Sequence, residues 1–317
     1  MTTADLGPVP WAGRLSRMLD GVHAIHGGSR YPIDVENLIP EIPSAHNTGE
    51  PIVVQGQELD PEFEGALFNL NPDQPGKGSW AVVYNQSIES EGRIRFTLAH
   101  ELGHYLVHRH LHGEFNCSEA DTLHWDSPER QMENQANIFA SCLLMPRPDF
   151  EAQIGSSPID LDVLGACSNR YGVSLTAAIL KWLEFTSARA VLVMSRNGRV
   201  QWARGSESGK WISIALNKKR SDGQRTRLPS SCATVLQTSS NVDRQGTELD
   251  ARVWFPNEPS GMTLREMRLV SDQYRQTMTL LVLPAEIKPW ERDQTQEEDE
   301  LEDTYNRFIR KGQFPVP

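Results

Sequence analysis

The sequence RIRFTLAHELGHYLVH, which runs from Arg93 to His108, decides how the first half of this chain folds. Its apolar residues recur at helical spacing, so the stretch is predicted to be a helix. Inside it, His100, Glu101 and His104 form the pattern H-E-x-x-H. Four residues turn a helix by about 400°, so the two imidazoles lie on one face, close enough to bind a single metal ion. Two histidines with a glutamate between them are the minimum apparatus for activating a water molecule.

The residues before this helix support the interpretation. Residues 79–84, SWAVVY, are apolar and rich in β-formers, and Asn85 begins a polar turn. Strand, turn and helix therefore follow in the expected order. The alternative is that both histidines are ordinary surface or core residues of a helix. The glutamate between them and the preceding strand favour the metal site.

A catalytic zinc site usually has three protein ligands, so a third ligand is required. His110 stands where the longer pattern H-E-x-x-H-x-x-G-x-x-H has its third histidine. However, Val107 occupies the position at which that pattern has a helix-breaking glycine. Without that turn the helix carries His110 away from the metal, which favours a solvated histidine at a helix end.

Glu133 is the stronger candidate for the third ligand. Ser127 and Pro128 are a good cap and first-turn residue for a second helix, which Pro146 ends. A core-facing stripe follows the helical period through Met132, Ala136, Phe139, Ala140, Leu143 and Leu144. Glu133 and Asn137 lie four residues apart at the edge of this stripe, so both can face the histidines. This arrangement predicts a ligand set of His100, His104 and Glu133, with Asn137 orienting one histidine; a solvated Glu133 is the alternative.

Two segments together resemble a known family. The sequence FTLAHELGH at 96–104, followed by E-x-x-A-N-x-F-A-x-x-L-L-M-P at 133–146, is similar to the ImmA/IrrE family of metallopeptidases, and the resemblance covers roughly residues 30–185. It implies a gluzincin-like enzyme with a minimal zincin-like domain of α+β class. It also implies that His100, His104 and Glu133 are the metal ligands and that Glu101 is the catalytic base. Members of this family cleave a helix-turn-helix repressor and thereby release its genes.

Composition limits the classes of function. With 317 residues, of which 38% are apolar, the chain is long enough for two domains, and its net charge of −11 disfavours free affinity for nucleic acid. The sequence has neither a long apolar run nor the layout of a signal peptide, so a cytoplasmic location is expected. The four cysteines lack C-x-x-C spacing, which argues against a disulfide framework. Cys117 lies between the two ligand-bearing helices and is a candidate redox-sensitive ligand. The favoured alternative is that Cys117 is a small apolar residue without a chemical role.

The expected organisation has four parts. Residues 1–150 form the metallopeptidase domain. It begins with an amphipathic helix over 12–27, whose apolar side consists of Leu15, Met18, Leu19, Val22 and Ile25, and it continues with short strands over 33–78. Residues 151–187 form a helix-turn-helix-like segment, with helices over 161–171 and 174–185. The second of these helices has a single cation, Lys181, and residues 160–186 carry a net charge of −1. Because binding to phosphates needs clustered cations, a packing role is favoured over DNA binding.

Residues 188–290 have strand patterns and predict a smaller α+β domain, which resembles in its position the GAF-like sensor domain of longer family members. Residues 187–229 contain ten Lys or Arg residues and two acids, a net charge of +8. They form either a solvated loop around Lys218, Lys219 and Arg220 or a patch for nucleic acid or an acidic partner. Residues 291–317 form an acidic tail that is able to screen this patch.

The sequence therefore predicts a metal-dependent endopeptidase that uses zinc, with manganese as the alternative ion. The expected protein substrate is a helix-turn-helix repressor, whose cleavage derepresses stress-response or mobile-element genes. A DNA-binding or partner-binding regulator with a structural metal site is the alternative function. Candidate stabilisers of the oxyanion are Tyr105, His108, His124 and Arg95.

Overall fold

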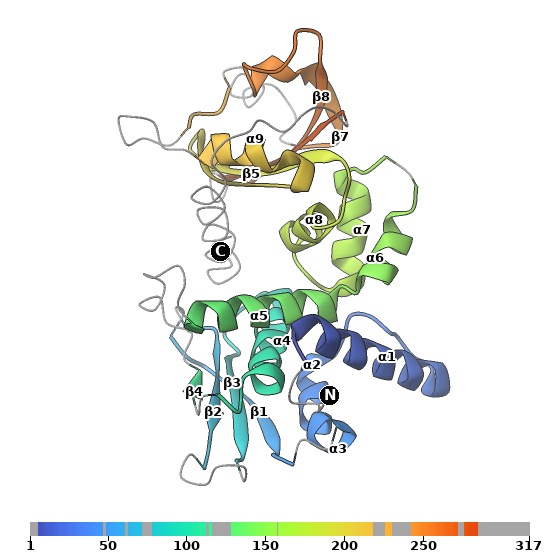
Figure 1. Cartoon of the computed structure of the whole chain (residues 1–317), viewed down its shortest axis with the longest axis vertical. Helices are drawn as coiled ribbons and strands as arrows, with labels where there is room; N and C mark the ends of the chain where they lie inside the picture. The colour runs from blue at the N-terminus through green and yellow to red at the C-terminus, as the bar shows by residue number, and fades with distance from the viewer. Residues whose placement is uncertain are drawn as a thin grey trace. The chain divides into compact units, whose positions relative to one another are not determined.

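The computed structural model describes residues 6–46, 49–60, 63–71, 78–111, 114–115, 128–156, 158–217, 226–229, 242–271 and 276–284. The chain mixes helices and strands (Figure 1), which confirms the predicted α+β class. It divides into two compact units. The first comprises Met1–Gly155 and Cys167–Ser174, and the second comprises Ser156–Ala166 and Leu175–Pro317. The predicted domain limits of 1–150, 151–187, 188–290 and 291–317 stay predictions, and the acidic tail lies outside the described residues.

The first unit has a four-stranded sheet in the order β1-β3-β2-β4. Its strands are β1 (Ile52–Gln57), β2 (Gly65–Asn69), β3 (Trp80–Asn85) and β4 (Glu114–Phe115). β3 is the strand predicted before the motif helix; it pairs in parallel with β1 and antiparallel with β2. At its end, Asn85 is buried, and its side chain binds the backbone of Leu59, Asp60, Phe63 and Ser87. Asn85 therefore holds the segment that leads into β2.

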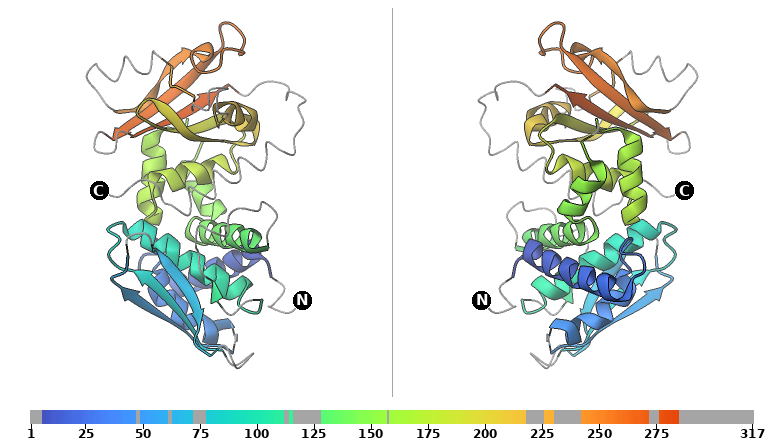
Figure 2. Two further views of the ribbon diagram at one scale, coloured as in Figure 1. Left: turned by 90° about the vertical axis from the view of Figure 1, so that its left-hand side faces the viewer. Right: turned by 90° about the vertical axis from the view of Figure 1, so that its right-hand side faces the viewer.

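The helices of the first unit lie against one side of this sheet (Figure 2). α4 (Glu91–Val107) contacts β2 and β3, α5 (Pro128–Leu144) packs on α4, and α1 (Pro8–His26) packs on α5. Ser90 caps α4 by accepting a hydrogen bond from the backbone N–H of Arg93. α6 (Arg147–Ile154) follows Pro146, which ends the preceding helical segment as predicted. The motif helix α4 therefore lies between the sheet and α5.

The prediction of short strands over residues 33–78 is wrong for its first part. Residues 35–46 form α2 (Val35–Leu38), a 3₁₀ helix (Ile39–Glu41) and α3 (Ile42–His46). The side chain of Asp34 caps the start by accepting from the backbone N–H of Asn37. The residues buried here follow a helical spacing of i, i+3, i+4 and i+7: Val35, Leu38, Ile39 and Ile42. This spacing and the cap outweigh the β-propensity of the isoleucines.

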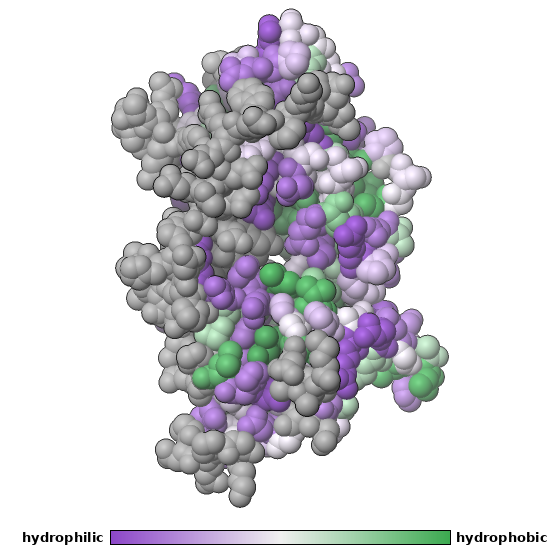
Figure 3. Space-filling view, viewed as in Figure 1, coloured by the Kyte–Doolittle hydropathy of each residue, from purple (hydrophilic) through white to green (hydrophobic). Residues whose placement is uncertain are grey.

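The stripe expected on the first helix is only partly buried. α1 begins at Pro8, and it buries Trp11, Ala12 and Leu15. Val22 and Ile25, which the periodicity placed on the core side, are 49% and 78% exposed. The apolar residues at this end of α1 show on the surface of the unit (Figure 3). Periodicity predicted the helix, but the length of the elements packed against it decides where burial stops.

The second unit is built on a five-stranded antiparallel sheet in the order β6-β5-β9-β8-β7. Its strands are β5 (Arg189–Arg196), β6 (Arg199–Gly205), β7 (Val242–Asp250), β8 (Thr263–Ser271) and β9 (Gln276–Leu283). Asn197 and Gly198 both have positive φ values, 51° and 70°, so a tight turn at these two residues joins β5 to β6 as a hairpin. The GAF-like assignment stays a prediction.

Helices cover this sheet. α9 (Lys210–Asn217) contributes Ile212 and Leu216 to a core with Val191, Val193 and Leu281 of the sheet. α8 (Leu175–Leu183) contacts β5 and is buried from Ala178 to Leu183. α7 (Leu161–Tyr171) and α8 are the helices predicted at these positions. None of the helices in the described part of the chain combines the length and the apolarity that crossing a bilayer requires.

Candidate metal centre

Three predicted side chains converge in the first unit. The Nε2 atoms of His100 and His104 lie 3.0 Å apart. Glu133 from α5 places Oε2 3.3 Å from Nε2 of His100 and Oε1 3.3 Å from Nε2 of His104. One donor atom from each residue lies within 4.8 Å of the other two. This is the spacing of groups that share one ion, and it is the cluster that the sequence predicted.

Gly103 explains how two helices bring these groups so close. A Cβ atom at Gly103 would lie 3.0 Å from Cδ1 of Phe139 and 3.2 Å from Cα of Ala136. The absence of a side chain therefore lets α4 and α5 approach each other directly at the motif. Glu133 precedes Ala136 by three residues, so the same approach brings its carboxylate to the histidines.

The predicted contact of Asn137 with a histidine of the motif is present at His100. Oδ1 of Asn137 lies 2.9 Å from Nδ1 of His100, and both side chains are buried. An amide oxygen only accepts hydrogen bonds, so Nδ1 of His100 carries a proton, and in the neutral ring Nε2 then presents its lone pair to the cluster. This is the tautomer that a metal ligand needs.

The other ligand histidine has a partner that the sequence did not predict. Nδ1 of His104 lies 3.1 Å from Nδ1 of His108, and Nε2 of His108 lies 2.9 Å from Oε1 of Gln135. His108 had been considered only as a stabiliser of the oxyanion. Its position four residues after His104 was a signal for this contact, because such residues are neighbours on a helix. Nothing in the sequence pointed to Gln135.

Electrostatics couple the three groups strongly. Burial opposes ionisation of Glu133, but its contacts with His100 and His104 outweigh this effect and hold its pKa well below the usual range. Burial lowers the pKa of His100, yet contact with Glu133 leaves that pKa raised. Burial lowers the pKa of His104 to about 4. A carboxylate that is only 12% exposed, between two buried imidazoles, is the donor set that suits a divalent cation.

Glu101, the predicted base, is buried beside the cluster. It is 1% exposed and stands next to His100 on α4, and burial raises its pKa to about 8. The charges of His100 and Glu133 both act on it, so its carboxyl group lies in the electrostatic field of the cluster. Glu101 is not one of the three converging donors.

The rival third ligand does not join the cluster. His110 is exposed and lies in the turn after α4, which continues through Val107 as expected from the missing glycine. Cys117 and His124 lie outside the described residues.

The other candidate stabilisers of the oxyanion are engaged elsewhere. The hydroxyl of Tyr105 donates to the backbone oxygen of Glu50, and Arg95 donates to the backbone oxygens of Ile33 and Gly172. The sequence therefore did not identify the residue that stabilises the oxyanion, and the candidates among the described residues bind other groups.

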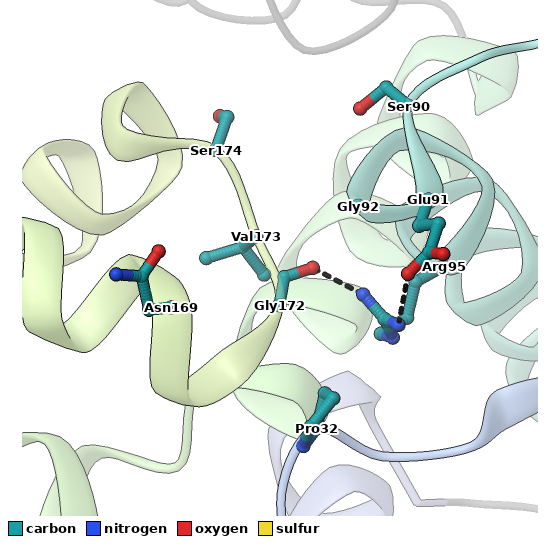
Figure 4. A pocket seen from close by; sticks show the side chains of 9 residues that line it. All are labelled: Pro32, Ser90, Glu91, Gly92, Arg95, Asn169, Gly172, Val173 and Ser174. Carbon is teal, nitrogen blue, oxygen red and sulfur yellow. Dashed lines mark hydrogen bonds and ion pairs between the residues drawn. The ribbon is translucent and has the colours of Figure 1, made fainter.

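A separate cavity of about 300 Å³ lies at the start of α4 (Figure 4). It is lined by Pro32, Ser90, Glu91, Gly92, Arg95, Asn169, Gly172, Val173 and Ser174. Arg95 crosses it to the turn at Gly172. His100 lies five positions after Arg95, so the two lie roughly 140° apart around the helix. The cavity therefore faces away from the metal ligands.

Comparison with known proteins identifies the segment that holds the cluster. A peptidase family model, described as the IrrE N-terminal-like domain, matches residues 61–183. This range includes His100, Glu101, His104 and Glu133 as well as both sequence motifs. No curated protein matches the chain. The motifs, the geometry of the cluster and this match agree, and residues 61–183 are similar to the ImmA/IrrE family of metallopeptidases.

Proposed function

We propose that this chain is an endopeptidase that hydrolyses a peptide bond in a protein substrate with the help of one divalent ion. The observation that supports it is the convergence of His100 Nε2, His104 Nε2 and the Glu133 carboxylate within 4.8 Å. Two imidazoles and one carboxylate match the three-ligand catalytic zinc sites of peptidases, so zinc is the ion we propose. The same donors accept manganese, and elemental analysis separates the two.

The chain's own residues perform the proton transfers. A bound ion supplies Lewis-acid chemistry, since it activates a water molecule and polarises the scissile carbonyl. Glu101 accepts the proton of the attacking water and then delivers it to the leaving amine. Asn137 holds His100 in the tautomer whose Nε2 faces the cluster. Burial of all these groups keeps bulk water away from the reacting atoms.

We propose a helix-turn-helix transcriptional repressor as the substrate, whose cleavage derepresses stress-response or mobile-element genes. This proposal is supported by the family resemblance of residues 61–183. The reaction takes place in the cytoplasm, where such repressors act.

The alternative of a DNA-binding regulator has little support in α8. Its one cation, Lys181, is 3% exposed, and its Nζ lies 2.9 Å from Oε2 of Glu184. A recognition helix needs exposed groups that reach phosphates and base edges. The buried face of α8 therefore supports a packing role for this helix, and the peptidase remains the proposed function.

The test combines metal content with cleavage. Wild type, Glu133→Ala and the control Glu151→Ala are analysed for metal and incubated with the repressor encoded nearest the gene. Glu151 is a matched control because it forms an exposed pair with Arg147 on α6. We expect about one ion per chain in wild type and control, with discrete cleavage, and the loss of both in Glu133→Ala. Metal retained by Glu133→Ala would refute the ligand set, and metal without cleavage would favour a binding role.

A further inference from the structure

We propose that His108 and Gln135 form a positioning pair that sets the tautomer of His104, so that Nε2 of His104 presents its lone pair to the ion. This proposal rests on the metal site proposed above. It concerns two residues that neither touch the ion nor belong to the H-E-x-x-H motif.

The amide oxygen of Gln135 fixes the direction of the hydrogen bonds that link Gln135, His108 and His104. Oε1 of Gln135 accepts, so Nε2 of His108, 2.9 Å away, carries a proton. A neutral imidazole with its proton on Nε2 has only an acceptor at Nδ1. Nδ1 of His104, 3.1 Å from that acceptor, must then be the donor. The remaining nitrogen of His104 is Nε2, which faces Glu133.

The two ligand histidines reach the same state by different routes. Asn137 acts directly on Nδ1 of His100, whereas Gln135 acts on His104 through one intervening imidazole. All three polar residues involved, Glu133, Gln135 and Asn137, belong to α5. One helix therefore supplies the carboxylate ligand and the two amide oxygens that orient the imidazole ligands, and its docking on α4 sets all three at once.

Burial makes the pair necessary for this arrangement. His104 is 0% exposed and His108 is 1% exposed, so water cannot readily replace either partner. Leaving a buried N–H group without an acceptor costs about 1–3 kcal/mol. If His108 were only a space-filling core residue, an apolar side chain of similar size would preserve metal binding. If it positions His104, only a side chain with an acceptor in the same place preserves it.

The experiment compares His108→Leu with His108→Gln, which have similar volumes but differ in the acceptor. Zinc affinity is measured by competition with a chelator. We expect His108→Leu to bind zinc about 10–100 times more weakly, and His108→Gln to recover most of that loss. Gln135→Leu should also weaken binding, whereas Gln135→Glu should not, because a carboxylate is a stronger acceptor in the same position. Thermal unfolding of each metal-free variant shows whether it folds.

A second readout reports the tautomers directly. Nitrogen-15 NMR of the zinc-loaded wild type should show the proton of His104 on Nδ1 and that of His108 on Nε2. Equal zinc affinity of folded His108→Leu and wild type, or a His108 proton on Nδ1, overturns the positioning pair and leaves the metal site intact. Absence of zinc from the wild type, or its retention in Glu133→Ala, overturns the proposed function and this proposal together.

Discussion

The helix pairs α4–α5 and α7–α8 differ in what they bury. α4 and α5 bury His100, Glu101 and His104, with Glu133 beside them. α7 and α8 bury mainly apolar side chains, among them Leu161, Leu164, Ile179 and Trp182. The single cation of α8, Lys181, is paired with Glu184, whose side chain is 41% exposed.

This difference distinguishes the helices that form the candidate site from the helices that only stabilise the fold. Burying ionisable groups opposes folding unless they are paired or bind a metal, so a cluster of them between two helices indicates a function. Apolar burial needs no such explanation, because it stabilises the fold by itself. Both helix pairs could be predicted as helices, but only their buried side chains indicate which pair forms the candidate site.

The largest expected effect comes from Glu101→Gln, which removes the base and keeps the shape of the side chain. Peptide cleavage should fall by about 10²–10⁴-fold in kcat/KM, while metal content stays at the wild-type level. The same substitution at Glu184, in the turn that follows α8, should leave cleavage unchanged. Undiminished cleavage by Glu101→Gln would remove Glu101 from the mechanism.

The approach of the helices can be tested at their glycines. Gly103→Leu should destabilise the protein by about 1–3 kcal/mol and weaken metal binding, because the new side chain forces α5 away from α4. Gly165 of α7 is the control, since a Cβ atom there meets only Nη1 of Arg244, 3.7 Å away. Gly165→Ala should be neutral or stabilise by up to about 1 kcal/mol. Thermal unfolding followed by circular dichroism measures both, and equal effects of the two would contradict the close approach at Gly103.

A smaller effect is expected from Asp149, which accepts two hydrogen bonds from Arg170 and one from the hydroxyl of Tyr171. Burial opposes ionisation of Asp149, but these bonds outweigh it and lower its pKa from the ordinary 3.8. Because the folded pKa is the lower one, the stabilisation is present above about pH 4 and is lost as pH falls through the folded value. Asp149→Asn should cost about 1–2 kcal/mol at pH 7.

Denaturant unfolding of wild type and Asp149→Asn at several pH values measures this dependence. The difference between the two proteins should shrink below about pH 4. Metal content should not change, since this charge supports the fold and not the centre. A difference that stayed constant down to pH 2 would show that the charge of Asp149 contributes nothing.

The smallest effect is expected from Lys181→Met. An apolar side chain of similar length should replace the buried stem, and Glu184 should stay hydrated, so stability should change by no more than about 1 kcal/mol. Retention on DNA at low salt and cleavage of the repressor should both be unchanged. Loss of DNA retention in this variant would show that α8 binds DNA and does not serve packing alone.

Predictions from periodicity succeeded where local signals agreed. The spacing of apolar residues in both motif helices and Pro146 after α5 indicate the same helices that the structure shows. They failed in α1, whose apolar stripe continues to Ile25 although burial stops at Leu15. They also failed at residues 35–46, where the strand-forming isoleucines lie in helices. In α1 the neighbouring elements decided where burial stops, and one chain segment contains no information about its neighbours. At residues 35–46 the helical spacing and the Asp34 cap outweighed the β-propensity of the isoleucines.

The sequence by itself determined that His100 and His104 share a helix face, because their spacing matches the helical period. It also identified Glu133 and Asn137, since both lie beside the core stripe of the next helix. Only the tertiary structure decided that Glu133 reaches both histidines, because this depends on how closely α4 and α5 pack at Gly103. The contact between His108 and Gln135 was likewise decided only by the tertiary structure. It joins residues 27 positions apart whose meeting is set by helix packing, which no local pattern records.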